Sequence, residues 1–150
     1  MKRAALFSCL TGLRISDILK LRWEEIERAS DGGWWMRICT EKTETEATLP
    51  ISDEALELCG EVQGEGVVFA GLRRCMIQHP LNAWIKAAGI RKHITFHCFR
   101  HTFATLQIAL GTDIYTVSKM LTHKSVKTTQ IYADLVNSKK RESANRISLR

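Results

Sequence analysis

Two histidines and an arginine lie within the stretch ITFHCFRHTFATL, residues 94–106, at spacings that suit a helix. His97 and His101 are four residues apart, and Arg100 lies between them. Histidines at this spacing can bind zinc, but the zinc-protease pattern requires a glutamate directly after the first histidine, where this chain has Cys98. A guanidinium beside a dication is also electrostatically unfavourable. The stretch therefore disfavours a metal site, and we interpret His101 on its own as a helix-surface or packing residue.

Basic groups along the chain favour an anionic ligand instead. Arg14 follows a glycine in TGLR at the start of a predicted helix, where backbone N–H groups also face anions. His97 and Arg100 are three residues apart, so they share one helix face. His123 lies in LTHKS, a loop just before a helix, and Tyr132 follows nine residues later. Each residue alone has an ordinary explanation as a solvated charge or a packing residue, but together they indicate a shared phosphate-like ligand.

The elements that position the first of these groups follow from periodicity and turn residues. Leucines at helical spacing predict a helix over residues 3–11, which the TG dipeptide ends, and a second helix is expected to begin with Ser16 as its N-cap. WWMRICT (34–40) and the segment 46–51 predict a β-hairpin with a charged, polar turn. GVVFA (66–70) predicts a third, short strand.

The second half of the chain is helical in pattern. The predicted helices are 80–88, 97–110, 113–121 and 125–136, preceded by a short helix over 52–60 that Ser52 caps. Apolar residues recur every three or four positions in the 97–110 helix and predict its core face: Phe96, Phe99, Phe103, Leu106 and Leu110. The expected fold is therefore mainly α with a small antiparallel β-sheet.

Composition sets the broad class of the protein. A chain of 150 residues fits one compact domain, and its net charge of +6 points weakly to polyanionic partners. The five cysteines are odd in number and far apart, without a CxxC pair, so we expect reduced thiols in a cytoplasmic protein. Apolar runs are too short for a membrane span. The first ten residues are not read as a signal peptide, because charged residues follow without a small-residue cleavage site.

The motifs resemble those of the tyrosine recombinases, or phage-type integrases. TGLRISDILKLRWEEI (11–26) is similar to the first arginine box of that family, and HCFRHTFAT (97–105) to its His-x-x-Arg box. LTHKSVKTTQIYAD (121–134) is similar to its box with the second histidine and the tyrosine. EKTETEATLPI (41–51) is similar to the hairpin that carries the family's catalytic lysine. Order and spacing also agree, so the resemblance covers nearly the whole chain.

The resemblance implies a role for each of these residues. Arg14 and Arg100 would hold the non-bridging oxygens of the scissile phosphate, and Tyr132 would be the nucleophile. His97 would accept or relay the proton of the attacking hydroxyl. Lys42, on the hairpin, would protonate the leaving 5′ oxygen. The expected activity is therefore cleavage and rejoining of DNA strands through a 3′-phosphotyrosine.

Two further residues complete the site that the resemblance implies. His123 would hydrogen-bond a phosphate oxygen, and Asp17, the one acid near these basic groups in the pattern, would support the site. The chemistry suits these residue types, since two arginine forks can neutralise the charge that grows on a phosphodiester in its transition state. A tyrosine needs a base and an alkoxide leaving group needs an acid. No metal, ATP or other cofactor is expected.

Departures from the family pattern bear on how the domain is organised. Thr122 stands where glycine usually precedes the second histidine, and Cys98 stands where an acid is frequent; we read both as variation. Family members normally carry an N-terminal helical domain that clamps DNA, and this chain begins almost at its arginine box. We therefore expect residues 1–150 to be an excised catalytic domain, with a basic tail at 138–150 exchanged between protomers.

The resemblance implies a site-specific recombinase of a phage or mobile element. Its expected partners are double-stranded DNA and other protomers, in a tetramer on paired sites, with no membrane involved. One alternative is a non-catalytic DNA-binding relic, but the complete set of six catalytic groups disfavours decay. Another alternative is a type IB topoisomerase that relaxes DNA, which the short chain and the integrase-like boxes disfavour.

Overall fold

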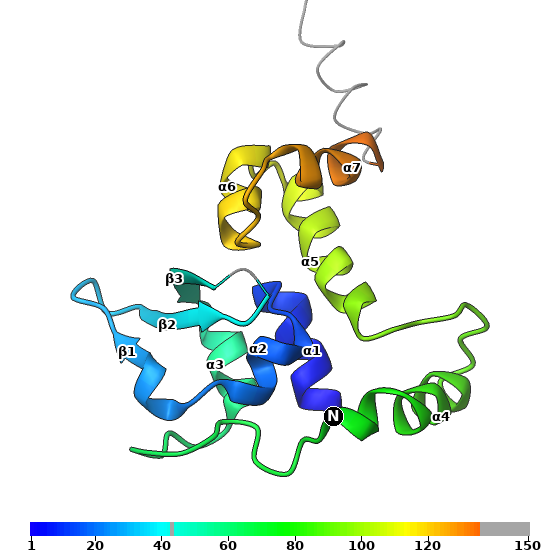
Figure 1. The fold of residues 1–150 in the computed structure, drawn as a ribbon, viewed down its shortest axis with the longest axis horizontal. Coiled ribbons are helices and arrows are strands. Elements are labelled where there is room, and N and C mark those ends of the chain that lie inside the picture. Colours follow the sequence, from blue (N-terminus) through cyan, green and yellow to red (C-terminus); the bar gives the residue numbers. More distant parts are fainter. Residues whose placement is uncertain (43, 136–150) are drawn as a thin grey trace, which may run out of the picture.

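The computed structural model describes residues 1–42 and 44–135, so the predicted tail at 138–150 lies outside the described residues. The helices are α1 (Lys2–Thr11), α2 (Ile15–Lys20), α3 (Asp53–Cys59), α4 (His79–Ala87), α5 (His97–Leu110), α6 (Ile114–Met120) and α7 (Lys127–Leu135). Short 3-10 turns lie at Trp23–Glu25 and Arg74–Ile77. Figure 1 shows α1, α2 and α3 beside a small sheet, and α5 leading away from them to α6 and α7. None of the helices in the described residues is long and apolar enough to cross a membrane.

The sheet has three antiparallel strands in the order β1 (Ile26–Arg28), β2 (Trp34–Thr40) and β3 (Thr45–Ile51). The predicted hairpin is confirmed, because β2 pairs with β3 from Trp34 opposite Ile51 to Thr40 opposite Thr45. The strand predicted over 66–70 is wrong, since Val67 makes only an isolated bridge to Arg22. The third strand is β1, whose three residues, IER, are too short and too charged to show an alternating pattern.

Gly12 follows the last residue of α1 and packs against α5. Its φ of 72° lies in the left-handed region, which glycine adopts without strain. A Cβ at this position would lie 2.6 Å from a ring carbon of Phe103 and 2.9 Å from a methyl carbon of Leu121. The chain therefore needs glycine here both to turn and to let α5 and α6 approach closely. This packing brings the segment after α1 next to the start of α5.

The buried face of α5 differs from the predicted stripe. Phe103 is buried as expected, but Leu106 and Leu110 are 52% and 81% exposed. The buried positions in α5 are instead Arg100, Phe103, Ala104 and Ile108. Because Arg100 is one of the buried positions, the apolar residues alone do not mark the buried face of α5. The helix contacts α1 on one side and α6 and α7 on another, so its core face is set by packing between elements.

The predicted helix ends are confirmed where a residue next to the helix caps or ends it. The side chain of Ser52 accepts a hydrogen bond from the backbone N–H of Ala55 at the start of α3, and Gly60 follows its end. Gly111 ends α5 in the left-handed conformation. The expected cap of α2 is wrong: Arg14, with extended backbone, occupies the N-cap position and Ser16 lies within the helix.

Candidate active site

A pocket of about 220 Å³ lies where the start of α2, the β2–β3 turn and the start of α5 meet. Four of the six predicted catalytic residues line it: Arg14, Lys42, His97 and Arg100. Arg74 lines it as well, and no sequence motif singled this residue out. No aspartate or glutamate is among its lining residues in the part of the chain that the structure describes. The pocket is therefore strongly cationic and suits an anionic ligand.

Arg100 is held rigidly by the backbone. The residue is 2% exposed, and its Nη1 donates to the carbonyl oxygen of Gly12 at 2.7 Å while Nη2 donates to the carbonyl oxygen of Leu121. Burial, and then the charge of Arg14, lower the pKa of Arg100 to about 10, so it stays charged at neutral pH. A guanidinium has five N–H donors, so two fixed contacts leave others available to a ligand.

Arg14 and Thr122 connect the segment after α1 to the loop after α6. Nη1 of Arg14 donates to the Thr122 hydroxyl at 3.3 Å. The same hydroxyl donates to the carbonyl oxygen of Leu121 at 2.6 Å. Thr122 has a φ of 52°, a conformation that β-branched residues rarely adopt and glycine adopts freely. The departure from glycine noted in the sequence therefore introduces backbone strain and supplies a hydrogen-bond partner for Arg14.

Asp17 links α2 to the turn that carries Lys42. It is 6% exposed, and its Oδ1 accepts a hydrogen bond from the backbone N–H of Glu41 at 3.0 Å. Its Oδ2 is buried without a hydrogen-bond partner among the described residues. The Asp17 charge acts to raise the pKa of Arg100, against the stronger lowering by burial and by Arg14. The supporting role of Asp17 stays a prediction.

The histidines of the site are held in the neutral form. Burial is the largest cause lowering the pKa of His97, followed by the charges of His101, Arg100 and other cations. Burial, Arg100 and Arg14 lower the pKa of His123 to about 4, and its Nδ1 lies 2.9 Å from the Thr129 hydroxyl. Neutral imidazoles can also bind metals. However, no cluster of three or more His, Cys, Asp or Glu side chains suited to a metal ion occurs among the described residues.

Tyr132 contacts a residue that the sequence did not assign to the site. Tyr132 is 3% exposed on α7, and its hydroxyl lies 2.8 Å from Nδ1 of His101. Burial raises the pKa of Tyr132, while the charges of Arg100 and Arg14 lower it, so the phenol lies within reach of both arginines' fields. The half-buried His101 therefore makes a specific hydrogen bond in addition to the packing role expected for it. The contact joins residues 31 apart in the sequence, so helical spacing alone gave no signal for it.

Tyr132 and His123 do not line the 220 Å³ pocket in this structure. Tyr132 instead contacts His101, which follows Arg100 on α5, and His123 directly follows Thr122, which Arg14 contacts. The structure therefore brings four predicted residues into one pocket and connects the other two to it through His101 and Thr122.

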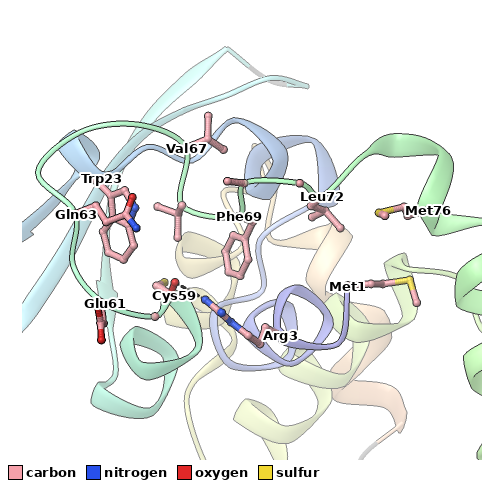
Figure 2. A pocket seen from close by; sticks show the side chains of 14 residues that line it. Met1, Arg3, Trp23, Cys59, Glu61, Gln63, Val67, Phe69, Leu72 and Met76 are labelled. Atoms are coloured by element: carbon pink, nitrogen blue, oxygen red, sulfur yellow. Dashed lines mark hydrogen bonds between the residues drawn. The ribbon is translucent and has the colours of Figure 1, made fainter.

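A larger cavity of about 610 Å³ lies elsewhere, against α1 and the loop that follows α3. Figure 2 shows Trp23, Phe69 and Leu72 around it, with Arg3 extending from α1 toward Cys59. Nε of Arg3 donates to the carbonyl oxygen of Leu58 at 2.7 Å, so this arginine is occupied by the end of α3. None of the predicted site residues lines this cavity.

Solved structures have the same fold as this chain. The crystal structure of XerA recombinase matches with a TM-score of 0.72 at 23% identity, covering 99% of this chain and 61% of that one. The catalytic domain of bacteriophage HP1 integrase matches with a TM-score of 0.71 at 21% identity, covering 95% of this chain and 79% of that one. The expected fold, mainly α with a small antiparallel sheet, is confirmed as that of these catalytic domains.

Sequence relatives agree with the fold. The tyrosine recombinase XerD of Lacticaseibacillus casei is 33% identical over 143 residues, which cover 85% of this chain and 47% of the relative. The tyrosine recombinase XerA of Saccharolobus solfataricus is 33% identical over 130 residues, covering 84% and 43%. The chain thus spans about half the length of the curated relatives it matches. The profile of the Phage integrase family matches residues 1–139, and the chain belongs to this family.

Proposed function

We propose that the chain is the catalytic domain of a site-specific DNA recombinase, which cleaves and rejoins strands through a covalent 3′-phosphotyrosine. The observation that carries this proposal is the 220 Å³ pocket, lined by three arginines, a lysine and a histidine and by no acid among the described residues. A phosphodiester gains negative charge in its five-coordinate transition state. Fixed cations stabilise that charge more than they stabilise the substrate, which is what lowers a barrier. The relatives named as tyrosine recombinases support the assignment.

Each group has a step in this reaction. Arg14 and Arg100 hold the non-bridging oxygens of the phosphate, since both residues line the pocket. The Tyr132 oxygen attacks phosphorus as its proton leaves, so a Tyr–O–P bond forms while the bond from phosphorus to the 5′ oxygen breaks. Lys42 gives that oxygen a proton. The reverse sequence reseals the strand, because the phosphotyrosine conserves the energy of the broken bond.

The two histidines serve the phosphate in this proposal. His97 lines the pocket beside the arginines, where it relays the proton of the attacking hydroxyl. His123 is fixed by Thr129 through Nδ1 at 2.9 Å, which leaves its other ring nitrogen to bond a phosphate oxygen. Both rings are neutral at physiological pH, because burial and neighbouring cations lower the pKa of each.

Double-stranded DNA and other protomers are the proposed partners, with a tetramer forming on paired sites. Two solved relatives support DNA as the substrate: XerH recombinase bound to its difH substrate, and a lambda integrase dimer bound to a core site. The basic segment at 138–150, outside the described residues, is the proposed contact between protomers.

A nicked DNA duplex that traps the covalent intermediate tests this function. We expect a protein–DNA adduct in the presence of a chelator, and none with Tyr132→Phe, which keeps the ring but lacks the attacking oxygen. Lys42→Ala should also fail on ordinary DNA, because its 5′ oxygen leaves unprotonated. Sulfur in place of that bridging oxygen needs no proton, so cleavage should return for Lys42→Ala and stay absent for Tyr132→Phe. An adduct that survives Tyr132→Phe would contradict the proposal.

A further inference from the structure

The proposed nucleophile is paired with a histidine that lies outside the expected catalytic set. The Tyr132 hydroxyl lies 2.8 Å from Nδ1 of His101, and the ring centroids are 5.5 Å apart at 49°. This geometry aims the reacting oxygen at a ring nitrogen rather than placing the phenol flat against the imidazole. His97, in contrast, lines the pocket and makes no hydrogen bond to Tyr132 in the part of the chain that the structure describes.

With His101 neutral and protonated at Nε2, the proton between these two groups lies on the tyrosine. Burial, reinforced by the charge of Arg100, lowers the pKa of His101, so its imidazole is neutral at physiological pH. Burial raises the pKa of Tyr132, so the phenol keeps its proton. A neutral Nδ1 with a free lone pair can therefore accept the hydrogen bond that the phenol donates. This is the ground state from which a general base acts.

His101 also lies between the tyrosine and the phosphate pocket. His97 is one turn earlier on α5, and the two imidazole rings meet edge to face with centroids 4.6 Å apart. Arg100, between them in sequence, acts electrostatically on both rings. A proton that leaves Tyr132 is therefore received next to the groups that hold the phosphate.

We propose that His101 is a catalytic residue: it accepts the phenolic proton as Tyr132 attacks phosphorus. The O–H bond of Tyr132 breaks as an N–H bond forms at Nδ1, and the Tyr–O–P bond forms as the bond to the 5′ oxygen breaks. That oxygen takes its proton from Lys42. This inference rests on the proposed recombinase function. It makes His101 the acceptor of the phenolic proton, in place of His97, which the resemblance implied.

The same contact could instead be a latch that keeps Tyr132 buried and inactive. The two roles predict opposite effects on the cleavage rate. Loss of a base slows cleavage, whereas loss of a contact that keeps Tyr132 inactive accelerates it. His101→Asn separates them, since an asparagine oxygen can accept the tyrosine's hydrogen bond but cannot take its proton. We expect the single-turnover rate of adduct formation on nicked DNA to fall by about 10²–10⁴ in this variant. His79→Asn, at an exposed histidine of α4, is the matched control.

A more acidic phenol should rescue the loss. The chain has two tyrosines, so a Tyr115→Phe background allows Tyr132 alone to be replaced by fluorotyrosine during expression. Fluorine lowers the pKa of the phenol, so a base is needed less. Fluorotyrosine should therefore increase the rate of adduct formation at least about tenfold more in His101→Asn than in the parent. A parental or faster rate of adduct formation in His101→Asn would show that His101 is not the base. A slow rate that fluorotyrosine leaves unchanged would show the same. A parent that forms no adduct refutes the recombinase function itself, so the two failures are distinguishable.

Discussion

The guanidinium of Arg100 is buried against two backbone carbonyls, whereas that of Arg14 is half-buried and donates to one side-chain hydroxyl. Arg100→Ala would leave the buried carbonyl of Gly12 without this donor and that of Leu121 with only the Thr122 hydroxyl. We therefore expect it to lower the unfolding free energy by about 2–4 kcal/mol. Arg14→Ala should lower it by less than about 1 kcal/mol. Each should lose at least ~10²–10³ in cleavage rate. Urea unfolding and adduct formation measure both effects, and an equal stability loss would contradict this difference.

Thr122 couples backbone strain to the position of Arg14. Its φ of 52° is unfavourable for a β-branched residue, so Thr122→Gly should raise the unfolding free energy by about 1 kcal/mol. The same change removes the hydroxyl that Arg14 contacts, so cleavage should slow. Thr122→Ser keeps the hydroxyl and should retain the rate. A glycine variant that is more stable and cleaves at the parental rate would show that the hydroxyl does not position Arg14.

Residue types in the sequence predicted most of the pocket, because the motifs carry Arg14, Lys42, His97 and Arg100 at recognisable spacings. Residues that act through contacts between elements gave no such signal. His101 meets Tyr132 only after α7 packs on α5, and Arg74 joins the pocket from a 3-10 turn outside every motif.

At the scale of elements, Asp17 ties α2 to the β2–β3 turn through the backbone N–H of Glu41. Asp17→Ala should free the turn and reduce the fraction of molecules in which Lys42 reaches the leaving group. We expect slower cleavage of ordinary DNA and a much smaller loss on DNA with a sulfur leaving group, which needs no proton. Glu41→Ala is the control, since it keeps the backbone N–H and removes an exposed ion pair with Lys20 and a weaker charge interaction with Arg74. Equal losses of cleavage rate on both substrates would show that Asp17 acts through folding or through Arg100, and not through Lys42.

Elements with a local signal were predicted well, and those set by packing were not. The hairpin follows from alternation and α3 from its serine cap, and both are confirmed. β1 was missed because a three-residue strand has too few positions to alternate. The core face of α5 was misplaced because Arg100, a charged residue, occupies a buried position that only the carbonyls of other segments make tolerable.

For the molecule as a whole, the neutral histidines of the site make stability depend on pH. The pKa of His123 is about 4 in the folded chain against an ordinary 6.5. Above pH 6.5 both states leave the ring neutral, whereas between 6.5 and 4 only the unfolded chain binds the proton. The unfolding free energy should therefore fall as pH drops through this window, and His97 and His101 act in the same direction. Urea titrations should show a flatter profile for His123→Asn, and an unchanged slope would contradict the assignment.

The net charge of +6 and the cationic pocket predict that DNA affinity depends steeply on salt. Each phosphate that a lysine or arginine neutralises releases counterions, so contact with about six phosphates gives a slope near −5 in log K against log salt. Arg74→Ala should reduce the slope by about one, because Arg74 lines the pocket without a motif role. Arg28→Ala is the control, since that guanidinium lies 5.9 Å from the Trp34 ring centroid and outside the pocket. Equal slopes for parent and Arg74→Ala, with a reduced slope for Arg28→Ala, would place the DNA against β1 instead of the pocket.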